Sequence, residues 1–144
     1  MPESEIILRY ERRIPRPDEF WRLFATTGWN DEYHLSAEEL FAAISNSWHV
    51  ISAYNNDDQL VGFGRVVSDG VLHAMIYDLI VDPQHRGNGI GAEILRQLVE
   101  ACKAASIRDI QLFSARGKRE FYEKRGFRAR MDDAPGMEYV GIQY

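Results

Sequence analysis

The chain of 144 residues carries a formal net charge of −5, and its pI is near 5.4. This length suits one domain with one hydrophobic core, so we expect residues 1–144 to form a single domain. The acidic balance argues against a general nucleic-acid or membrane-surface binder, because such proteins present a basic patch. The single cysteine, Cys102, excludes a disulfide or a cysteine metal cluster within this chain.

The sequence shows no pattern from which we would expect a targeting segment or a metal site. The start, Met1–Glu5, lacks the basic-then-apolar pattern of a signal peptide, and no run reaches the length of a membrane span. We therefore expect a cytoplasmic location, or the mature form of an imported protein. The histidines show no metal-ligand spacing, so we expect no metal. A Gly-x-Ser-x-Gly elbow is also absent, which argues against covalent catalysis through a serine.

The first half of the chain predicts two helices before any long sheet. Apolar residues at helical spacing follow Pro15–Asp18, and Ser36–Glu39 has the pattern of a capping box. Turn residues Asn55–Asp58 separate two apolar runs, which is typical of a hairpin. The expected elements are a strand over Glu5–Tyr10, a helix to about Thr26, a helix after Ser36, and hairpin strands Trp48–Tyr54 and Leu60–Val67.

The second half predicts a strand, helix and strand, followed by a short closing region. A right-handed crossover through the helix would make the two strands parallel. The expected elements are strands Val71–Val81 and Ile110–Phe113 around a helix from Ile90 to about Ala105, a short helix Lys118–Arg125, and closing strands Phe127–Arg130 and Met137–Ile142. The order β-α-α-β-β-β-α-β-α-β-β describes an α+β fold with a mixed sheet.

Three glycines lie between the expected strand and the long helix. Gly87, Gly89 and Gly91 allow the backbone to turn sharply and to offer successive N–H groups beside a helix N-terminus. This arrangement predicts a phosphate site. Arg86 supplies a local charge partner for phosphate, whereas we expect His85 to be a solvated loop residue.

Two other nucleotide-binding designs share a strand, a glycine turn and a helix. A P-loop needs Lys-Ser/Thr after its last glycine, but Ala92 and Glu93 stand there. Gly87-x-Gly89-x-x-Ala92 satisfies the loose dinucleotide fingerprint, which also asks for an acidic residue about 20 positions on. Asp109 is near that spacing but at the start of its strand. An NAD-binding oxidoreductase therefore remains an alternative.

The glycine segment and its surroundings resemble the GNAT acetyltransferase superfamily. The resemblance covers roughly Gln59 to Phe127 and rests on Arg86-x-x-Gly89-x-Gly91, Val81-Asp82-Pro83 and Phe121-Tyr122-Glu123-Lys124-Arg125-Gly126-Phe127. Within the superfamily, Val61–Arg65, Ser68–Gly70, Asp78–Pro83 and Gly136-Met137 resemble the bacterial and plastid group that includes serotonin N-acetyltransferases.

The resemblance implies a site for acetyl-CoA between two strands that splay apart, Tyr77–Val81 and Ile110–Phe113. The backbone of Leu79, Ile80 and Val81 would pair with the pantetheine arm. The pyrophosphate would be held by Arg86, Gly87, Asn88, Gly89, Ile90 and Gly91. Many members carry Asn before the Tyr helix, whereas this chain has Ser114–Lys118, so Arg116 or Lys118 would contact CoA instead.

Tyr122 is the candidate general acid. The resemblance places this tyrosine beside the thioester sulfur, where a phenol with a pKa of about 10 can protonate a leaving thiolate with a pKa of about 8.5. It would also count among the residues that contact CoA. The alternative is that Tyr122 and Phe121 are both core residues of a short amphipathic helix.

Asp78 interrupts an otherwise apolar strand. Strand alternation predicts that its side chain shares a face with Ile76 and Ile80, where a carboxylate must be partnered or functional. One interpretation is an ion pair with a neighbour such as Arg65. The other is a carboxylate that attracts a cationic amine or takes its proton.

Aromatic residues near the first two helices are candidates for the acceptor site. Trp29 and Tyr33 could form an apolar wall around an acceptor, or they could be ordinary core residues. Together, these features predict direct acetyl transfer from acetyl-CoA to a primary amine of a small molecule, without metal, nucleic acid or membrane partners. A homodimer is compatible with this expectation. The alternative is an acyl-CoA-binding sensor of the same fold with little turnover.

Overall fold

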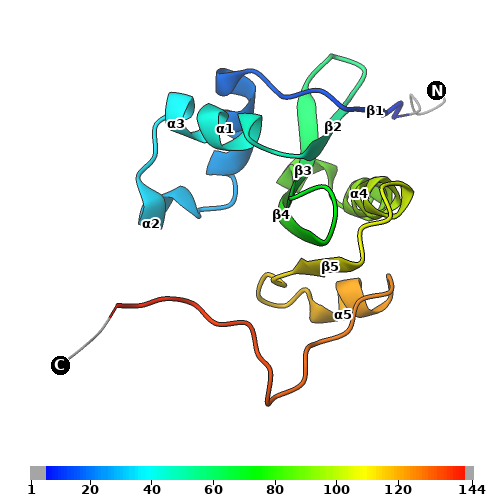
Figure 1. Ribbon diagram of the computed structural model, residues 1–144. Helices are drawn as coiled ribbons and strands as arrows, with labels where there is room; N and C mark the ends of the chain where they lie inside the picture. The colour runs from blue at the N-terminus through cyan, green and yellow to red at the C-terminus, as the bar shows by residue number, and fades with distance from the viewer. Residues whose placement is uncertain (1–5, 142–144) are drawn as a thin grey trace. The chain divides into compact units, whose positions relative to one another are not determined.

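The computed structural model describes residues 6–141. The chain divides into two compact units, Met1–Leu112 and Phe113–Tyr144, and each is described by itself. Whether residues 1–144 form a single domain stays a prediction. The first unit contains, in chain order, β1 (Arg9–Glu11), α1 (Pro17–Ala25), α2 (Asn30–Tyr33), α3 (Ala37–Ser45), β2 (His49–Tyr54), β3 (Leu60–Ser68), β4 (His73–Val81), the 3₁₀ turn η1 (Pro83–His85), α4 (Ile90–Ala104) and β5 (Asp109–Leu112) (Figure 1).

The sheet of the first unit has the order β1-β2-β3-β4-β5. Neighbouring strands are antiparallel from β1 to β4, whereas β4 and β5 are parallel. This confirms the predicted meander and the strand-helix-strand crossover. The first strand begins later than expected, at Arg9. Glu5, where the predicted strand begins, lies outside the described residues.

The helix starts follow the capping signals in the sequence. Ser36 Oγ accepts a hydrogen bond from the Glu39 N–H at 3.1 Å, and the Glu39 carboxylate accepts from the Ser36 N–H at 3.1 Å. The sequence did not predict α2, a single turn in which the Asn30 side chain bonds both the N–H and the C=O of Leu35. None of the described helices combines the length and apolar character needed to span a bilayer.

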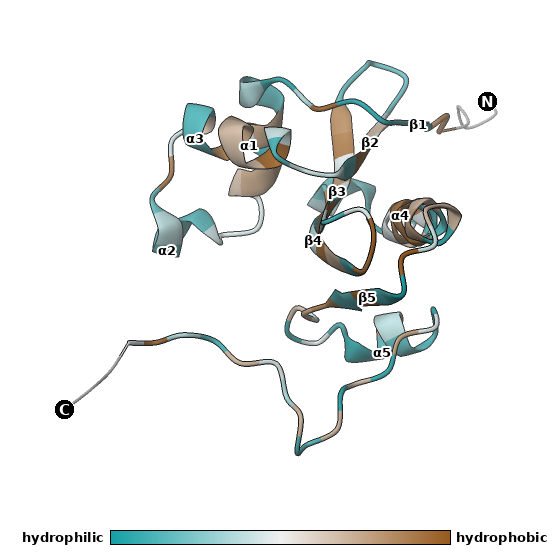
Figure 2. Cartoon of the chain, viewed as in Figure 1, coloured by the Kyte–Doolittle hydropathy of each residue, from teal (hydrophilic) through white to brown (hydrophobic). Residues whose placement is uncertain are grey.

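Helices cover both faces of the sheet in the first unit. On one face, α1 and α3 pack on Val50, Tyr54 and Phe63. On the other, α4 lies close to β3, where a Cβ on Gly62 would stand 2.7 Å from Ile90. Figure 2 shows hydrophobic residues on α4 and on the strands. The glycine in β3 therefore allows the first turn of α4 to lie directly against the sheet.

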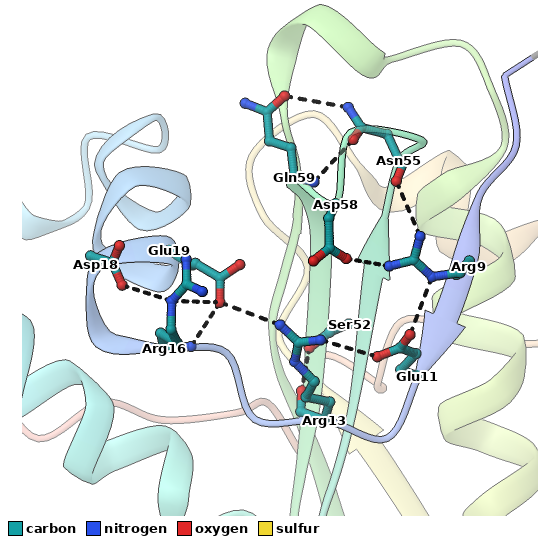
Figure 3. Close-up of polar contacts among 10 residues, drawn as sticks. All are labelled: Arg9, Glu11, Arg13, Arg16, Asp18, Glu19, Ser52, Asn55, Asp58 and Gln59. Atoms are coloured by element: carbon teal, nitrogen blue, oxygen red, sulfur yellow. Dashed lines mark hydrogen bonds and ion pairs between the residues drawn. The ribbon is translucent and has the colours of Figure 1, made fainter.

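A polar network attaches the start of α1 to the edge of the sheet. Arg13 extends between Glu11 of β1 and Glu19 of α1, with N–O distances of 3.6 and 3.8 Å. The Ser52 hydroxyl donates to the Arg13 carbonyl at 2.6 Å. Figure 3 shows these contacts and the neighbouring pair of Arg16 with Glu19. Farther along α1, Arg22 contacts Asp82 at the end of β4, as described below.

The second unit contains α5 (Arg119–Glu123), which confirms the predicted short helix. The prediction of closing strands over Phe127–Arg130 and Met137–Ile142 is wrong for the described residues, because 127–141 contain no strand. Ile142 itself is not described. Met137, Tyr139 and Val140 are 76–86% exposed. An apolar run favours a strand only where a partner strand completes its hydrogen bonds, and local sequence does not reveal that partner.

Candidate functional site

The end of β4 has a free backbone edge in the first unit. Pairing with β5 joins His73 to Asp109 at one end and Ile76 to Leu112 at the other. β4 then continues through Tyr77–Val81, where Ile80 and Val81 still pair with β3. On the opposite side, no strand of the first unit's described residues pairs with Tyr77–Val81. This edge can therefore accept an extended ligand as a further strand.

A β-bulge lies in β4 at Asp78. The register slips between Phe63 and Arg65, and Asp78 has φ +54°. Asp is one of the few non-glycine residues that adopt this left-handed conformation readily. The bulge changes the alternation of side chains, so Ile76 lies opposite Val66 on the α4 face and Ile80 packs in the core beneath α1 and α3. The prediction that Asp78 shares one face with both isoleucines is therefore wrong.

Asp78 forms an ion pair with Arg65. Arg65 Nε donates to Asp78 Oδ2 at 2.7 Å, and both side chains are mostly buried, with exposed fractions of 16% and 22%. Arg65 Nη1 also donates to the Ala43 carbonyl at 3.3 Å and to the Ser47 hydroxyl at 3.4 Å. The ion pair expected from one interpretation is thus present. It links the bulge to the end of α3.

Beyond β4 the chain turns through η1 and the glycines into α4 (Figure 1). Gly87 has φ +85° and Gly89 has φ +71°. Gly89 is the N-cap of α4, and a Cβ at either glycine would meet no atom within 4 Å. The backbone therefore needs glycine here because of its conformation and not because of crowding, and it leaves open space beside the loop.

The loop has the properties of an anion site. The first N–H groups of α4 have no partner within the helix, and the glycine N-cap offers no side chain to accept their hydrogen bonds. The Arg86 side chain is exposed and forms no ion pair with any described residue. Asn88 is fixed by a hydrogen bond from its amide to the His85 carbonyl at 3.0 Å. The arrangement can bind phosphate oxygens from both the backbone and Arg86.

The negative charge of Glu93, in the first turn of α4, is offset by its neighbours. Glu93 accepts hydrogen bonds from Arg96 at 2.6 and 3.0 Å and from Gln97 at 2.9 Å. Arg96 and Gln97 lower the pKa of Glu93 to about 2. The glutamate is therefore ionised at neutral pH, and Arg96 offsets the charge that would otherwise repel a phosphate.

Asp82, between β4 and the loop, is a functional candidate that sequence reasoning missed. Its side chain is 9% exposed and pairs with Arg22 of α1 at 3.2 Å. Burial alone would raise the pKa of Asp82, but the Gln84 N–H, Arg22 and His85 together hold it below its usual value. His85 is also mostly buried, with its Nδ1 3.6 Å from Asp82, so the prediction of a solvated histidine is wrong. An Asp-Pro pair at a strand end is the sequence signal of such a turn.

Tyr122 lies in α5 of the second unit. Its ring packs edge-on against Phe121 at 5.1 Å and Phe127 at 6.0 Å between centroids. Burial raises the pKa of the Tyr122 phenol. The side chain is only partly buried. The phenol is thus protonated at neutral pH and its proton is available.

The two basic CoA-contact candidates, Arg116 and Lys118, precede α5 in the second unit. Both are exposed. Gly117 between them has φ +80°, and the Lys118 N–H bonds to the Ala115 carbonyl at 3.0 Å. Neither side chain forms an ion pair within residues 6–141. Their charges are therefore available to a phosphate.

Trp29 and Tyr33 are at the two ends of α2 in the first unit. The Trp29 ring packs edge-on against Phe24 at 5.9 Å and is 37% exposed, and Tyr33 is 62% exposed. Neither residue belongs to the buried core, which argues against the purely structural alternative. They remain candidates for an acceptor wall.

The described residues offer neither an activated cysteine nor a cluster of metal ligands. Cys102 is fully buried in α4, and burial raises its pKa, so its thiolate is disfavoured at neutral pH. Among residues 6–141, no group of three or more His, Cys, Asp or Glu side chains is placed to hold a metal ion.

Comparison with known proteins gives a family match over most of the chain. A profile described as acetyltransferase (GNAT) domain matches residues 24–139. The probable acetyltransferase TAP2 of Glycine max is 30% identical over 80% of this chain. The uncharacterized N-acetyltransferase ycf52 of Pyropia yezoensis is 36% identical over 66% of this chain. The chain spans about half the length of such relatives, 55% and 56% respectively.

Solved structures show the same fold. A GNAT-family acetyltransferase of Streptococcus pneumoniae aligns with a TM-score of 0.75 at 26% identity, covering 96% of this chain and all of that one. The glucosamine-6-phosphate N-acetyltransferase of Arabidopsis thaliana aligns with a TM-score of 0.69 at 17% identity, covering 94% and 99%. These likenesses confirm the predicted fold class.

Proposed function

Because the chain belongs to the GNAT acetyltransferase family, whose domain profile matches residues 24–139, we propose that it transfers an acetyl group from acetyl-CoA to a primary amine of a small molecule. One observation supports the donor site most strongly. The free edge of β4 leads within a few residues into a glycine loop at the N-terminus of α4. A ligand with an extended amide-bearing arm could pair with the strand edge, and its pyrophosphate could reach the glycine loop.

The residues of the first unit suit the two parts of such a donor. The backbone of Leu79, Ile80 and Val81 would hydrogen-bond the amides of the pantetheine arm. The backbone N–H groups of residues 87–91 and the Arg86 guanidinium would bind the pyrophosphate. Arg116 or Lys118 would add a further phosphate contact. Acetyl-CoA supplies the acetyl group as an activated thioester.

The proposed transfer is direct and needs no enzyme-bound acetyl group. The amine nitrogen forms a bond to the acetyl carbon as the carbon–sulfur bond breaks. A backbone N–H of β4 stabilises the negative charge that develops on the carbonyl oxygen. Tyr122 donates its proton to the leaving thiolate, and the amine loses a proton to water or to Asp78.

The acceptor is proposed to be a small, partly apolar amine. Between Arg22 and Arg65 the sequence contains no Lys or Arg, and Asp31, Glu32, Glu38 and Glu39 lie on or beside α2 and α3. These charges favour a cation. The exposed rings of Trp29 and Tyr33 would supply apolar contact.

Asp78→Asn is expected to weaken the use of the amine while sparing the binding of CoA. The substitution removes the charge that would attract a protonated amine but keeps the size of the side chain. We expect the KM for the amine to rise about tenfold, which corresponds to roughly 1.4 kcal/mol, with an unchanged Kd for CoA measured by calorimetry. Asp57→Asn, which removes an exposed carboxylate in the β2–β3 turn, is the matched control. Unchanged amine kinetics in Asp78→Asn would leave the carboxylate as a structural partner of Arg65.

The rate is expected to rise with pH. An alkylamine with a pKa near 10 is about 99.9% protonated at pH 7, so the nucleophilic free amine increases tenfold for each pH unit. Burial raises the pKa of Tyr122 above its ordinary value of 10.0, so the acid stays protonated up to that range. We expect kcat/KM to increase from pH 6 to about 9 without a falling limb. A fall in rate below pH 9 would show that another group supplies the proton.

A thiol-release assay with acetyl-CoA and different acceptors tests the proposal. The panel contains small arylalkylamines, a histone tail peptide and glucosamine 6-phosphate, because one relative in Glycine max is named a histone acetyltransferase and one structural neighbour acts on the sugar phosphate. Thiol release with the arylalkylamines supports the proposal. Exclusive use of the peptide or the sugar phosphate contradicts the acceptor class.

Measurements of CoA and NAD binding, made beside this assay, separate the other classes of function. CoA binding without thiol release would indicate an acyl-CoA sensor, and binding of NAD instead of CoA would indicate an oxidoreductase. The cytoplasm remains the proposed location, although two relatives of Arabidopsis thaliana are named chloroplastic. A homodimer also remains a proposal, which sedimentation of the purified chain would test.

A further inference from the structure

We propose that Asp82 and Arg22 are positioning residues. They would hold the glycine loop, residues 86–91, in the conformation that binds phosphate. This inference rests on the proposed donor site but concerns residues outside it. Neither side chain belongs to the glycine loop, and Arg22 is separated from Asp82 by 60 residues in sequence. The two side chains contact each other at the point where β4 ends and the loop begins.

Asp82 is attached to the sheet on one side and to the loop on the other. Its N–H donates to the Val61 carbonyl of β3 at 2.8 Å. Its Oδ1 accepts from the Gln84 N–H at 2.9 Å, and its carbonyl accepts from the His85 N–H at 2.9 Å. The carboxylate therefore caps η1, and the direction in which the chain leaves β4 depends on it.

Arg22 fixes the other oxygen of this carboxylate. Its Nη1 donates to Asp82 Oδ2 at 3.2 Å, and its Nη2 donates to the Leu60 carbonyl at 2.6 Å. The guanidinium thus joins α1, the start of β3 and the end of β4. A planar group with two fixed partners restricts the rotation of the Asp82 carboxylate.

The contacts continue from Asp82 to the glycines. His85 lies 3.6 Å from Asp82 Oδ1 through Nδ1, and its carbonyl accepts from the Asn88 amide at 3.0 Å. Asn88 stands between the two glycines with positive φ. Without the carboxylate, η1 would lose its cap and the loop N–H groups would sample orientations that do not converge on a phosphate. Binding of the pyrophosphate would then weaken, because ordering the loop would oppose it.

Steady-state kinetics with two donors test this role. Asp82→Asn and Arg22→Gln are each expected to raise the KM for acetyl-CoA about tenfold, with kcat within about twofold of the wild type. The double variant should be no worse than the poorer single variant, because both substitutions break the same contact. S-acetylpantetheine lacks the pyrophosphate, so its kcat/KM should be the same in all these variants.

Arg16→Gln is the matched control. It removes another arginine of the α1 region, whose partners are Asp18 and Glu19. The kinetic constants for acetyl-CoA and for S-acetylpantetheine should both stay unchanged. If Asp82→Asn does not fold, Arg22→Gln carries the test, because the Arg22 side chain is 43% exposed. A lower melting temperature with an unchanged KM for acetyl-CoA would overturn the inference. An equal fall in kcat/KM with acetyl-CoA and with S-acetylpantetheine would overturn it as well. Failure of the wild type to bind CoA at all would instead overturn the proposed function.

Discussion

Replacement of Tyr122 by phenylalanine is expected to lower turnover by roughly 10²–10⁴-fold, the range found for the loss of a general acid. The substitution removes only the hydroxyl, while the ring can keep its packing against Phe121 and Phe127. The side chain is only partly buried, so little stability should be lost. The measurement is the rate of thiol release at saturating acetyl-CoA, together with the melting temperature.

Tyr139→Phe provides the control for this substitution. Tyr139 belongs to the same unit and is 86% exposed, so the removal of its hydroxyl should affect neither rate nor stability. Turnover of Tyr122→Phe within a few fold of the wild type would show that Tyr122 is structural or that the amine step limits the rate. A large loss of melting temperature would indicate a structural role as well.

Gly89→Val is expected to abolish measurable binding of CoA. Gly89 has φ +71°, which a β-branched residue adopts only at a cost of about 1–2 kcal/mol. Valine would therefore move the N-cap of α4 out of the conformation that presents the N–H groups. It would also place two methyl groups where the backbone must approach the pyrophosphate. Calorimetric titration with CoA measures the effect.

Gly28→Val is the control that distinguishes the effect of backbone strain on stability from the effect on CoA binding. Gly28 has a similar φ of +77°, and a Cβ there also meets nothing within 4 Å. It lies between α1 and α2, away from the phosphate loop in sequence, so its substitution should reduce stability by a similar amount and leave CoA affinity intact. Unchanged CoA affinity in a folded Gly89→Val protein would contradict the assignment of the loop.

Elements with strong local signals could be predicted from the sequence. The capping box at Ser36, the apolar spacing of α4 and the turn at Asn55–Asp58 each depend on residues close together in the chain. Such signals decide local backbone geometry without help from distant residues. The positive φ of Gly87 and Gly89 belongs to the same class, because it depends on the local backbone. The phosphate-binding role of these glycines stays a prediction.

Features that depend on distant partners could not be predicted in the same way. The bulge at Asp78 reverses side-chain direction within β4, and only the register with β3 reveals it. The pair of Arg22 and Asp82 joins segments 60 residues apart. The expected strand at Phe127–Arg130 failed because a strand needs a partner that no local pattern specifies.

Amide hydrogen exchange with and without acetyl-CoA tests the location of the donor site most directly. The account predicts that acetyl-CoA slows exchange in two segments, the backbone of Leu79–Val81 at the free edge of β4 and the N–H groups of residues 87–92 at the start of α4. Exchange in the β2–β3 turn, which is outside the proposed site, should not change. Protection confined to other segments, with these two unaffected, would contradict the account.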